Sequence, residues 1–384
     1  PPNPVAMNHH QNQTTRRRLH WNKASPSLRP DDLFIMQASK KILTTFMRLP
    51  AEPAGRKAAR GLWGASATSG DIRNMYEIAP LLDDPIHNLK TIRDLYRWAV
   101  TELETSDLSF GHGSPSALED ASFLICRALK LPFENFDMFL DAALTHNELV
   151  RIVHLIDRRV HDKTPTAYLL KEAWLTEHRF YIDERALIPR SYIAELLEED
   201  LAPWAADPEA VQSVLDLCTG SGCLAILAQG AFPNAKVTGS DISQAALEVA
   251  KINRRDYDME ETLELVQSDL FENLQGRRFD IIISNPPYVT TDAMERLPSE
   301  YRHEPALALA AGADGMDVVR RILAEAADHL TEEGFIVVEV GDGLEAVEAA
   351  FPGLPITWLS VSGGDDQVFL AQRADLAQYF KTQH

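Results

Sequence analysis

Seven short apolar runs, with helical stretches between most of them, fill the sequence from residue 212 onward. Strands that alternate with helices are typical of a doubly wound sheet whose strands run mainly parallel. The last two runs are joined only by SGGDD (362–366), which is too short for a parallel crossover, so they should pair antiparallel. The sequence therefore predicts an α/β fold with seven strands, one of them reversed. The expected strands are 213–218, 236–241, 263–269, 280–285, 334–340, 356–361 and 367–372.

The segment before this sheet, residues 76–165, has a helical pattern. Apolar side chains repeat at helical spacing in TIRDLYRWAVTELE (91–104). Ser114, followed by a proline, predicts the start of a second helix, and Asn147 predicts the start of a third. The segment is therefore expected to form a small amino-terminal helical domain whose apolar stripes build its own core.

Two further segments complete the predicted organisation. Residues 166–211 should connect the helical domain to the sheet domain (212–384), and AWLTEHRFYID (173–183) within them alternates like a β-hairpin. Residues 1–75 are polar and basic without a period, and they predict a disordered extension in which only 31–49 could form an amphipathic helix. A basic, acid-poor head also resembles a transit peptide, so a targeting role stays open.

Charge is distributed unevenly along the chain. The formal net charge is −20, yet residues 1–60 hold eleven Lys or Arg against three Asp or Glu, a local +8, so the remaining 324 residues carry −28. Because nucleic-acid affinity depends on neutralising phosphates, so acidic a body argues against a direct nucleic-acid reader and suits a basic protein partner.

Composition also bears on location and on metals. No stretch approaches the ~18 apolar residues of a membrane span. The three cysteines form no CxxC pair or disulfide framework, which favours a reducing, cytoplasmic setting. The twelve histidines lack metal-ligand spacing, so no metal site is expected.

A glycine loop links the first strand to the next helix in LDLCTGSGCLAI (215–226). Gly220 and Gly222 allow a tight turn and close approach to a ligand. Nineteen residues beyond Gly222, Asp241 ends the next strand, where a carboxylate can bind both hydroxyls of a ribose. This pair predicts a nucleoside cofactor, but by itself it does not separate a nicotinamide dinucleotide from S-adenosylmethionine.

Acidic residues at neighbouring strand ends favour S-adenosylmethionine. Asp216 precedes the loop, which contains no Lys or Arg, and a carboxylate there is unfavourable beside a pyrophosphate but favourable near an ammonium and a sulfonium. Asp269, at the end of the third strand, could accept from the adenine amine while Leu270 packs against the ring. The carboxyl ends of these parallel strands should converge on one crevice.

In FDIIISNPPYV (279–289), a predicted buried strand ends directly in a rigid turn, NPPY (285–288). This turn is called the corner below. In the simplest interpretation Asn285 is a turn residue and the prolines only end the strand. If the fourth strand lies beside the first, however, Asn285 faces the methyl end of the cofactor. The Asn285 side-chain oxygen and the Pro286 carbonyl could then hold the hydrogens of a substrate amide, with Pro287 fixing the corner and Tyr288 covering the flat group.

The loop and the NPPY segment together resemble the HemK-type N(5)-glutamine methyltransferases over about 300 residues. SFGHG (109–113) and IPRS (188–191) look like the branch that methylates a glutamine of large-subunit ribosomal protein uL3. The release-factor branch more usually has Pro-Arg-Pro-Glu-Thr-Glu at the second site. EPALALAAGADGMD (304–317) also resembles the family's segment before the next helix.

The resemblance implies a class I, Rossmann-like methyltransferase sheet and methyl transfer from S-adenosylmethionine to a glutamine side-chain amide of uL3. It also implies that Arg190 helps to shape the substrate entrance. The implied cofactor residues are Cys218, Thr219, Gly220, Ser221, Gly222, Asp241, Asp269 and Leu270, and the implied amide-binding residues are Asn285, Pro286 and Tyr288. Asp216 and Asn285, assigned above from their positions, complete the predicted cofactor residues, and Pro287 completes the predicted catalytic residues.

Three other functions stay open at this point. A release-factor glutamine methyltransferase would share the chemistry. A nucleic-acid adenine amino-methyltransferase also uses NPPY to orient an amine, but it needs a basic groove and a flipped base. A ribosome-assembly binding factor would keep its assembly function in a variant that cannot methylate. The oligomeric state is not predicted.

Overall fold

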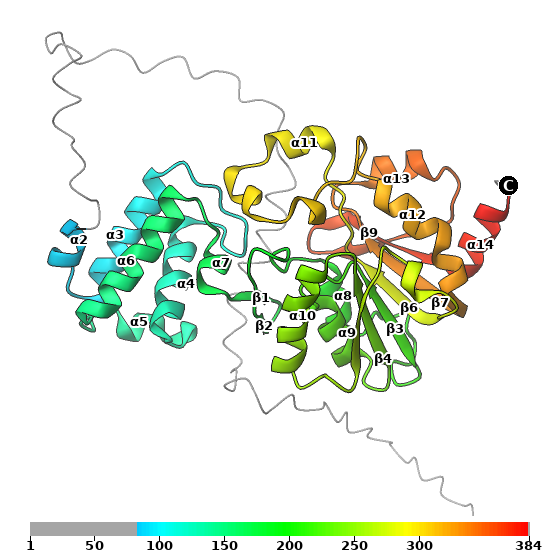
Figure 1. The fold of residues 1–384 in the computed structure, drawn as a ribbon, viewed down its shortest axis with the longest axis horizontal. Coiled ribbons are helices and arrows are strands. Elements are labelled where there is room, and N and C mark those ends of the chain that lie inside the picture. Colours follow the sequence, from blue (N-terminus) through cyan, green and yellow to red (C-terminus); the bar gives the residue numbers. More distant parts are fainter. Residues whose placement is uncertain (1–82, 383–384) are drawn as a thin grey trace, which may run out of the picture.

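The computed structural model describes residues 83–382, which form a helical part and a sheet part (Figure 1). The expectations for residues 1–75, including the possible helix at 31–49, lie outside the described residues.

A seven-stranded sheet with the order β5-β4-β3-β6-β7-β9-β8 forms the carboxy-terminal part. β9 runs antiparallel to β7 and β8, and the other neighbouring pairs are parallel. The predicted seven-stranded sheet with one reversed strand is therefore confirmed. The strands are β3 (Ser213–Leu217), β4 (Lys236–Asp241), β5 (Leu263–Gln267), β6 (Phe279–Ser284), β7 (Leu330–Glu339), β8 (Thr357–Val361) and β9 (Gly364–Gln372).

β7 differs most from its predicted range, because it begins at Leu330 rather than at 334. Its first residues, LTEE, are largely polar and carry no apolar run that could have predicted a strand. In the structure Leu330 pairs with Phe279, and a shift of register follows before Ile281 pairs with Phe335. Pairing with β6 therefore extends β7 where its own composition would not.

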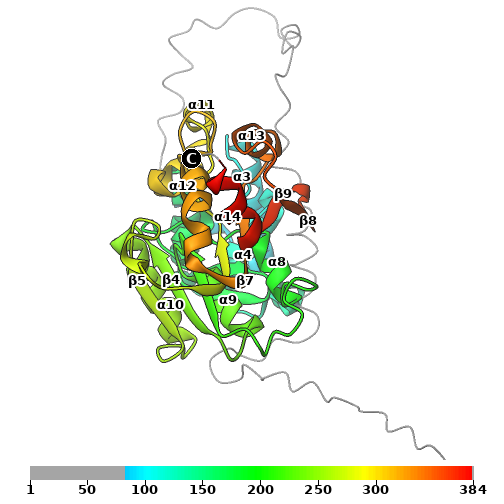
Figure 2. The ribbon, with the colours of Figure 1, turned by 90° about the vertical axis from the view of Figure 1, so that its right-hand side faces the viewer.

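Helices cover both faces of the sheet (Figures 1 and 2). Ile281 and Ile283 pack into the core beneath α8 (Ile193–Glu198) and α9 (Cys223–Ala231). Ile282, between them, packs into the core on the opposite face. The uninterrupted apolar run of β6 is thus that of a strand buried on both sides. The remaining helices of this part are α10 (Gln244–Asp256) beside β4 and β5, and α12 (Asp317–Ala326), α13 (Leu344–Ala350) and α14 (Arg373–Lys381) over the second core.

The helical part packs around its own apolar core. Two predicted helix starts were wrong by two residues. Ser116 caps the second helix in place of Ser114, and Thr145 forms a capping box with Glu148 in place of Asn147. In both places several polar residues stand close together, and only the one with extended backbone directly before the first turn can cap. The helices are α2 (Asp83–Asn88), α3 (Ile92–Thr105), α4 (Ala117–Leu129), α5 (Phe136–Phe139), α6 (His146–His161) and α7 (Thr166–Leu170).

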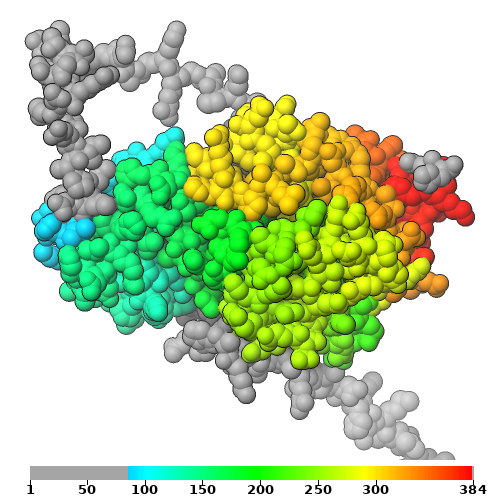
Figure 3. Space-filling model, in the orientation of Figure 1, coloured from blue at the N-terminus to red at the C-terminus, as the bar shows by residue number. Residues whose placement is uncertain are grey.

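Two segments join the parts. The predicted hairpin is present as β1 (Ala173–Leu175) and β2 (His178–Phe180), which pair antiparallel. The segment from 289 to 316, between β6 and α12, carries α11 (Thr291–Arg296) and short turns at Ser299–His303 and Ala306–Ala308. This segment, yellow in Figure 3, lies against the helical part, where His303 Nε2 contacts the Asp162 carbonyl oxygen at 2.9 Å. Within residues 83–382, no helix has the length and apolar character to cross a membrane.

Candidate active site

A cavity of about 200 Å³ opens at the carboxyl ends of β3, β4, β5 and β6. The chain leaves β3 toward β4 on one side and returns to β6 on the other, so the cavity lies where the strand order reverses. Open α/β sheets bind ligands in such crevices. Of the predicted site residues, those that line the cavity are Arg190, Cys218, Thr219, Gly220, Ser221, Asp241, Asp269, Leu270, Asn285 and Pro287. Asp216, Gly222, Pro286 and Tyr288 are not among the lining residues.

The glycine loop turns through left-handed backbone at Cys218, Gly220 and Gly222, with φ of 66°, 55° and 79°. Only glycine adopts such angles without steric cost. At Gly222 a second constraint applies, because an added Cβ would lie 3.1 Å from the Ala250 Cβ on α10. The second glycine thus permits close helix packing, and the first permits the turn beside the cavity.

Asp216 lies beneath the loop and not beside the cavity. Its Oδ2 accepts from Thr219 Oγ1 at 2.5 Å and from the Ala225 N–H, in the first turn of α9, at 2.9 Å. Burial raises the pKa of this carboxyl to about 7, and the two hydrogen bonds oppose the rise. The prediction had Asp216 facing a cationic cofactor. In the structure the alternation of β3 turns the side chain toward α9, where it holds the loop to the helix.

Asp241 ends β4 at the cavity wall. Its Oδ2 accepts from the Gly220 N–H and its Oδ1 from the Ser243 N–H, each at 2.8 Å. Burial raises the pKa of Asp241, and these backbone donors oppose the rise. Because each carboxylate oxygen has a further lone pair, both can still accept from neighbouring hydroxyls. The residue therefore joins the glycine loop to the position that the sequence assigns to a ribose.

The far wall combines apolar and charged groups. Ile242 and Leu270 line the cavity, and Ile242 is 46% exposed although it is apolar. Asp269 Oδ1 pairs with Arg321 Nη2 of α12 at 2.9 Å. Ile242 directly follows Asp241 but was not predicted as a site residue, because only the carboxylate at this strand end was assigned a role. Arg321 was not predicted because its ion pair joins α12 to Asp269, which follows β5 and is distant in the sequence.

Asn285 follows β6 and lines the cavity. Its Nδ2 donates to the backbone carbonyl of Arg190 at 3.1 Å. Within residues 83–382, the Asn285 Oδ1 accepts no hydrogen bond. The Tyr288 ring lies against the turn after β7, since a Cβ added at Gly341 would come 2.9 Å from its Cε2, and burial raises the pKa of its phenol. The corner thus presents an amide whose donor end is already engaged.

Arg190 lines the cavity, and its guanidinium pairs with Glu304. The Nη1 and Nη2 atoms donate to the two carboxylate oxygens at 2.6 and 2.7 Å. Glu304 belongs to the EPALAL segment, in which the sequence analysis had assigned no site residue. Leu307 of the same segment lines the cavity and is 58% exposed. The exposure of Leu307 beside the cavity places this segment at the cavity mouth, and exposure is a property that the sequence alone does not show.

Among the residues that the structure describes, no group of three or more His, Cys, Asp or Glu side chains is arranged to hold a metal ion.

Comparison with known proteins gives a consistent family. The model of the methyltransferase small domain matches residues 195–299. The chain is 50% identical over 294 residues to the ribosomal protein uL3 glutamine methyltransferase of Burkholderia pseudomallei, covering 75% of this chain and 96% of that protein. It is 51% identical over 288 residues to the Bordetella pertussis enzyme of the same name, covering 75% and 97%. The corresponding enzyme of Neisseria meningitidis serogroup B is 47% identical over 296 residues, covering 77% and 97%.

Proposed function

Since this chain belongs to the family of the ribosomal protein uL3 glutamine methyltransferases, we propose that it transfers a methyl group from S-adenosylmethionine to a glutamine side-chain amide nitrogen of uL3. The observation that carries this proposal is the hydrogen bond that fixes the side-chain amide of Asn285. Its Nδ2 is bound to the Arg190 carbonyl, so its Oδ1 is available as an acceptor at the cavity.

The residues around the cavity fit S-adenosylmethionine. Asp241 can accept from both ribose hydroxyls while it keeps its backbone donors. Ile242 and Leu270 offer apolar surfaces to the adenine ring, and Asp269 can accept from the adenine amine. We assign Asp216 to shaping the loop. When bound, S-adenosylmethionine supplies a methyl group on a positively charged sulfur.

The corner of Asn285 and Pro286 orients the substrate. An amide nitrogen is a poor nucleophile because its lone pair is delocalised into its carbonyl. We assign the two amide hydrogens to two acceptors, Asn285 Oδ1 at the cavity and the adjoining carbonyl of Pro286, which is itself buried behind the cavity lining. Held in this way, the amide directs its lone pair toward the methyl donor. Positioning of this kind is a large catalytic contribution, on the order of 7 kcal/mol or more in well-oriented reactions. Pro287 stiffens the corner, and Tyr288 supports it from the side of β7.

This arrangement does not require a strong general base. Once the substrate nitrogen carries the methyl group it becomes strongly acidic and loses its proton readily. The buried carboxyls near the site therefore need not take that proton, and Asp216 and Glu339 are engaged in hydrogen bonds with the chain itself.

Charge and family together support a basic protein substrate. The region outside residues 1–60 carries a formal charge of −28, which favours encounter with a cationic partner. The relatives named above are methyltransferases of uL3, and we infer the same substrate here, methylated in the cytoplasm. The helical part, which borders the segment that forms the cavity mouth, is the surface we assign to substrate recognition.

Mass spectrometry after incubation with S-adenosylmethionine tests this function. We expect a gain of one methyl group on a single glutamine of purified uL3, located by fragmentation, and a gain at least ~100-fold slower with the Asn285→Ala variant. Release factors and adenine-containing oligonucleotides serve as competing substrates in parallel reactions. Preferential methylation of a release factor or of adenine, with uL3 unmodified, would overturn the proposed substrate. An absence of methylation on all three would count against the proposed function.

A further inference from the structure

The loop of residues 188–192 is anchored at its first half by Glu304. Glu304 Oε1 accepts from the Ile188 N–H at 3.1 Å, and the carboxylate forms the two-point pair with Arg190 described above. The Glu304 side chain is fully buried. Burial alone would raise the pKa of Glu304, but the Arg190 charge and the hydrogen-bonding groups of His112 and Arg190 lower it to about 2. The anchor is therefore an ionised carboxylate.

A second buried carboxylate, that of Glu339 at the end of β7, anchors the other half of the loop. Its Oε2 accepts from Ser191 Oγ at 2.5 Å and from the Tyr192 N–H at 2.8 Å. The Arg190 carbonyl lies between these two anchors, and it is the acceptor for Asn285 Nδ2. A carbonyl held on both sides can keep the Asn285 amide in one orientation.

Glu304 also contacts the helical part. His112 Nε2 lies 3.4 Å from Glu304 Oε2, and both side chains are buried. The His112 ring packs on Tyr301 with 4.3 Å between ring centroids, and the Arg190 guanidinium lies over the same tyrosine ring. One carboxylate thus joins a loop of the helical part, SFGHG, to the loop that holds Asn285.

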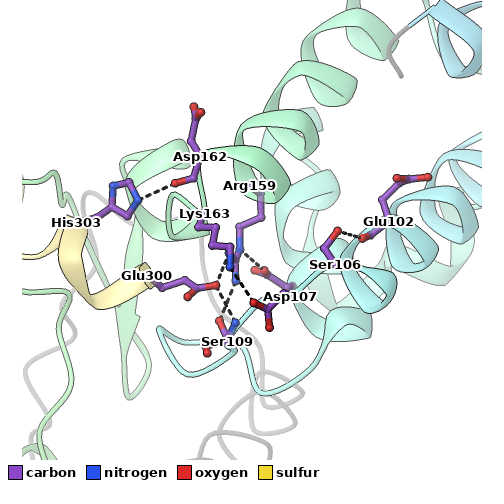
Figure 4. A network of polar contacts seen from close by, with 10 residues as sticks. Glu102, Ser106, Asp107, Ser109, Arg159, Asp162, Lys163, Glu300 and His303 are labelled. Carbon is purple, nitrogen blue, oxygen red and sulfur yellow. Dashed lines mark hydrogen bonds and ion pairs between the residues drawn. The ribbon is translucent and has the colours of Figure 1, made fainter. Parts of the chain in front are cut away.

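Glu300, one turn earlier in the same segment, provides a natural comparison. Its Oε1 accepts from the Ser109 N–H at 2.7 Å and lies 3.4 Å from Arg159 Nη1 (Figure 4). Arg159 in turn donates to Asp120 and to the Ser109 carbonyl. Glu300 is buried like Glu304, yet among residues 83–382 its hydrogen bonds and ion pairs go to Ser109 and Arg159 of the helical part, and none reaches Arg190.

We propose that Glu304 is a positioning residue for methyl transfer, acting through the Arg190 carbonyl on the Asn285 amide, whereas Glu300 only holds the two parts of the molecule together. The proposal rests on the role of Asn285 proposed above. Loss of the Glu304 charge frees the Arg190 guanidinium and loosens the carbonyl, so Asn285 is no longer held in one orientation. The cofactor wall at Asp241 and the glycine loop do not contact Glu304 and should stay intact.

The test compares Glu304→Gln with Glu300→Gln in the full chain, with purified uL3 as substrate. Both changes remove one charge from a buried ion pair of the same segment, so both should lower the unfolding temperature. We expect Glu304→Gln to lower kcat by about 10- to 100-fold, the scale of a misplaced catalytic group. Its calorimetric affinity for S-adenosylhomocysteine should stay near wild type. Glu300→Gln should keep kcat within a few-fold of wild type.

A second variant covers the case in which Glu304→Gln does not fold. Arg190→Lys keeps the positive charge but cannot form the two-point pair. It should also lower kcat while leaving affinity for S-adenosylhomocysteine unchanged. Equal kcat values for the Glu304 and Glu300 variants, or for Arg190→Lys and wild type, would overturn the inference, as would a matching loss of cofactor affinity. An inactive wild-type enzyme would instead count against the proposed function, so the two failures are distinguishable.

Discussion

Asn285 donates a hydrogen bond from its side-chain Nδ2 to the backbone carbonyl of Arg190 over 3.1 Å, although 95 positions separate the two residues. Because the Nδ2 end of the amide is bound within the protein, the Oδ1 end remains for a substrate. The contact supports the orienting role that we propose, because a turn former would need no distant partner for its side chain.

Replacing Asn285 by Asp is the sharpest test of that role. Asp is close in size and suits turns, so a turn former should tolerate it. A carboxylate, however, cannot donate to the Arg190 carbonyl, and it adds negative charge beside the bound sulfonium. We expect turnover to fall by at least ~100-fold, the scale for losing one positioned polar group. Affinity for S-adenosylmethionine should be kept or improved. Asn285→Ala should lose similar turnover without gaining affinity, and wild-type turnover in both variants would mean that the corner has only a structural role.

Asp241→Ala should weaken S-adenosylhomocysteine binding. The change removes the proposed ribose acceptor together with the acceptor for the Gly220 N–H. We expect a loss of roughly 1.5–3 kcal/mol, the range for hydrogen bonds to a charged group. Titration calorimetry measures it directly. Glu248→Gln, an exposed change on the neighbouring α10, serves as the control and should bind like wild type. Equal affinity of Asp241→Ala and the control would remove Asp241 from the binding site.

Glu339 should make the protein less stable as the pH rises toward neutrality. Burial raises its pKa to about 7, against an ordinary glutamate value near ~4.3 in the unfolded chain. Between these values the folded protein binds a proton that the unfolded chain has lost, so this group's contribution to the free energy of unfolding falls with rising pH. Glu339→Gln cannot titrate. Its stability relative to wild type should therefore rise by up to roughly 3 kcal/mol between pH 4.5 and pH 8.

Urea unfolding at the two pH values measures this change. Glu332→Gln, on the same strand but exposed, is the matched control and should show no comparable rise. A constant difference between Glu339→Gln and wild type across the range would contradict the raised pKa.

Deleting residues 1–75 should leave methylation of uL3 within a few-fold of the full chain. The cavity, the Asn285 corner and the contacts of Glu304 are all built from later residues. Steady-state kinetics on the truncated and full chains would measure the difference. If turnover collapsed while circular dichroism showed an intact fold, the extension would have to take part in function.

The number of strands, the one reversed strand and most strand positions could be predicted because they depend on local signals. A run such as FDIIIS is buried on both faces wherever it lies, and a connection of five residues cannot cross over between parallel strands. The glycine loop and the acidic residue at the next strand end are close in sequence, so their spacing alone indicated one site. Helix caps were less predictable, because Ser114 and Ser116 have the same chemistry and only the backbone angles distinguish them.

The sequence by itself thus determined the strands of the sheet, the glycine loop with the carboxylate at the next strand end, and the corner that ends β6, because each follows from periodicity or from residues within one βα unit. Only the tertiary structure decided how the side chains are used. It turned Asp216 beneath the loop and engaged Arg190 with Glu304. It also brought His112 of the helical part to that same carboxylate. The physical reason is that these are hydrogen bonds and ion pairs between residues far apart in the chain, and their partners are chosen by packing and burial, which no local pattern encodes.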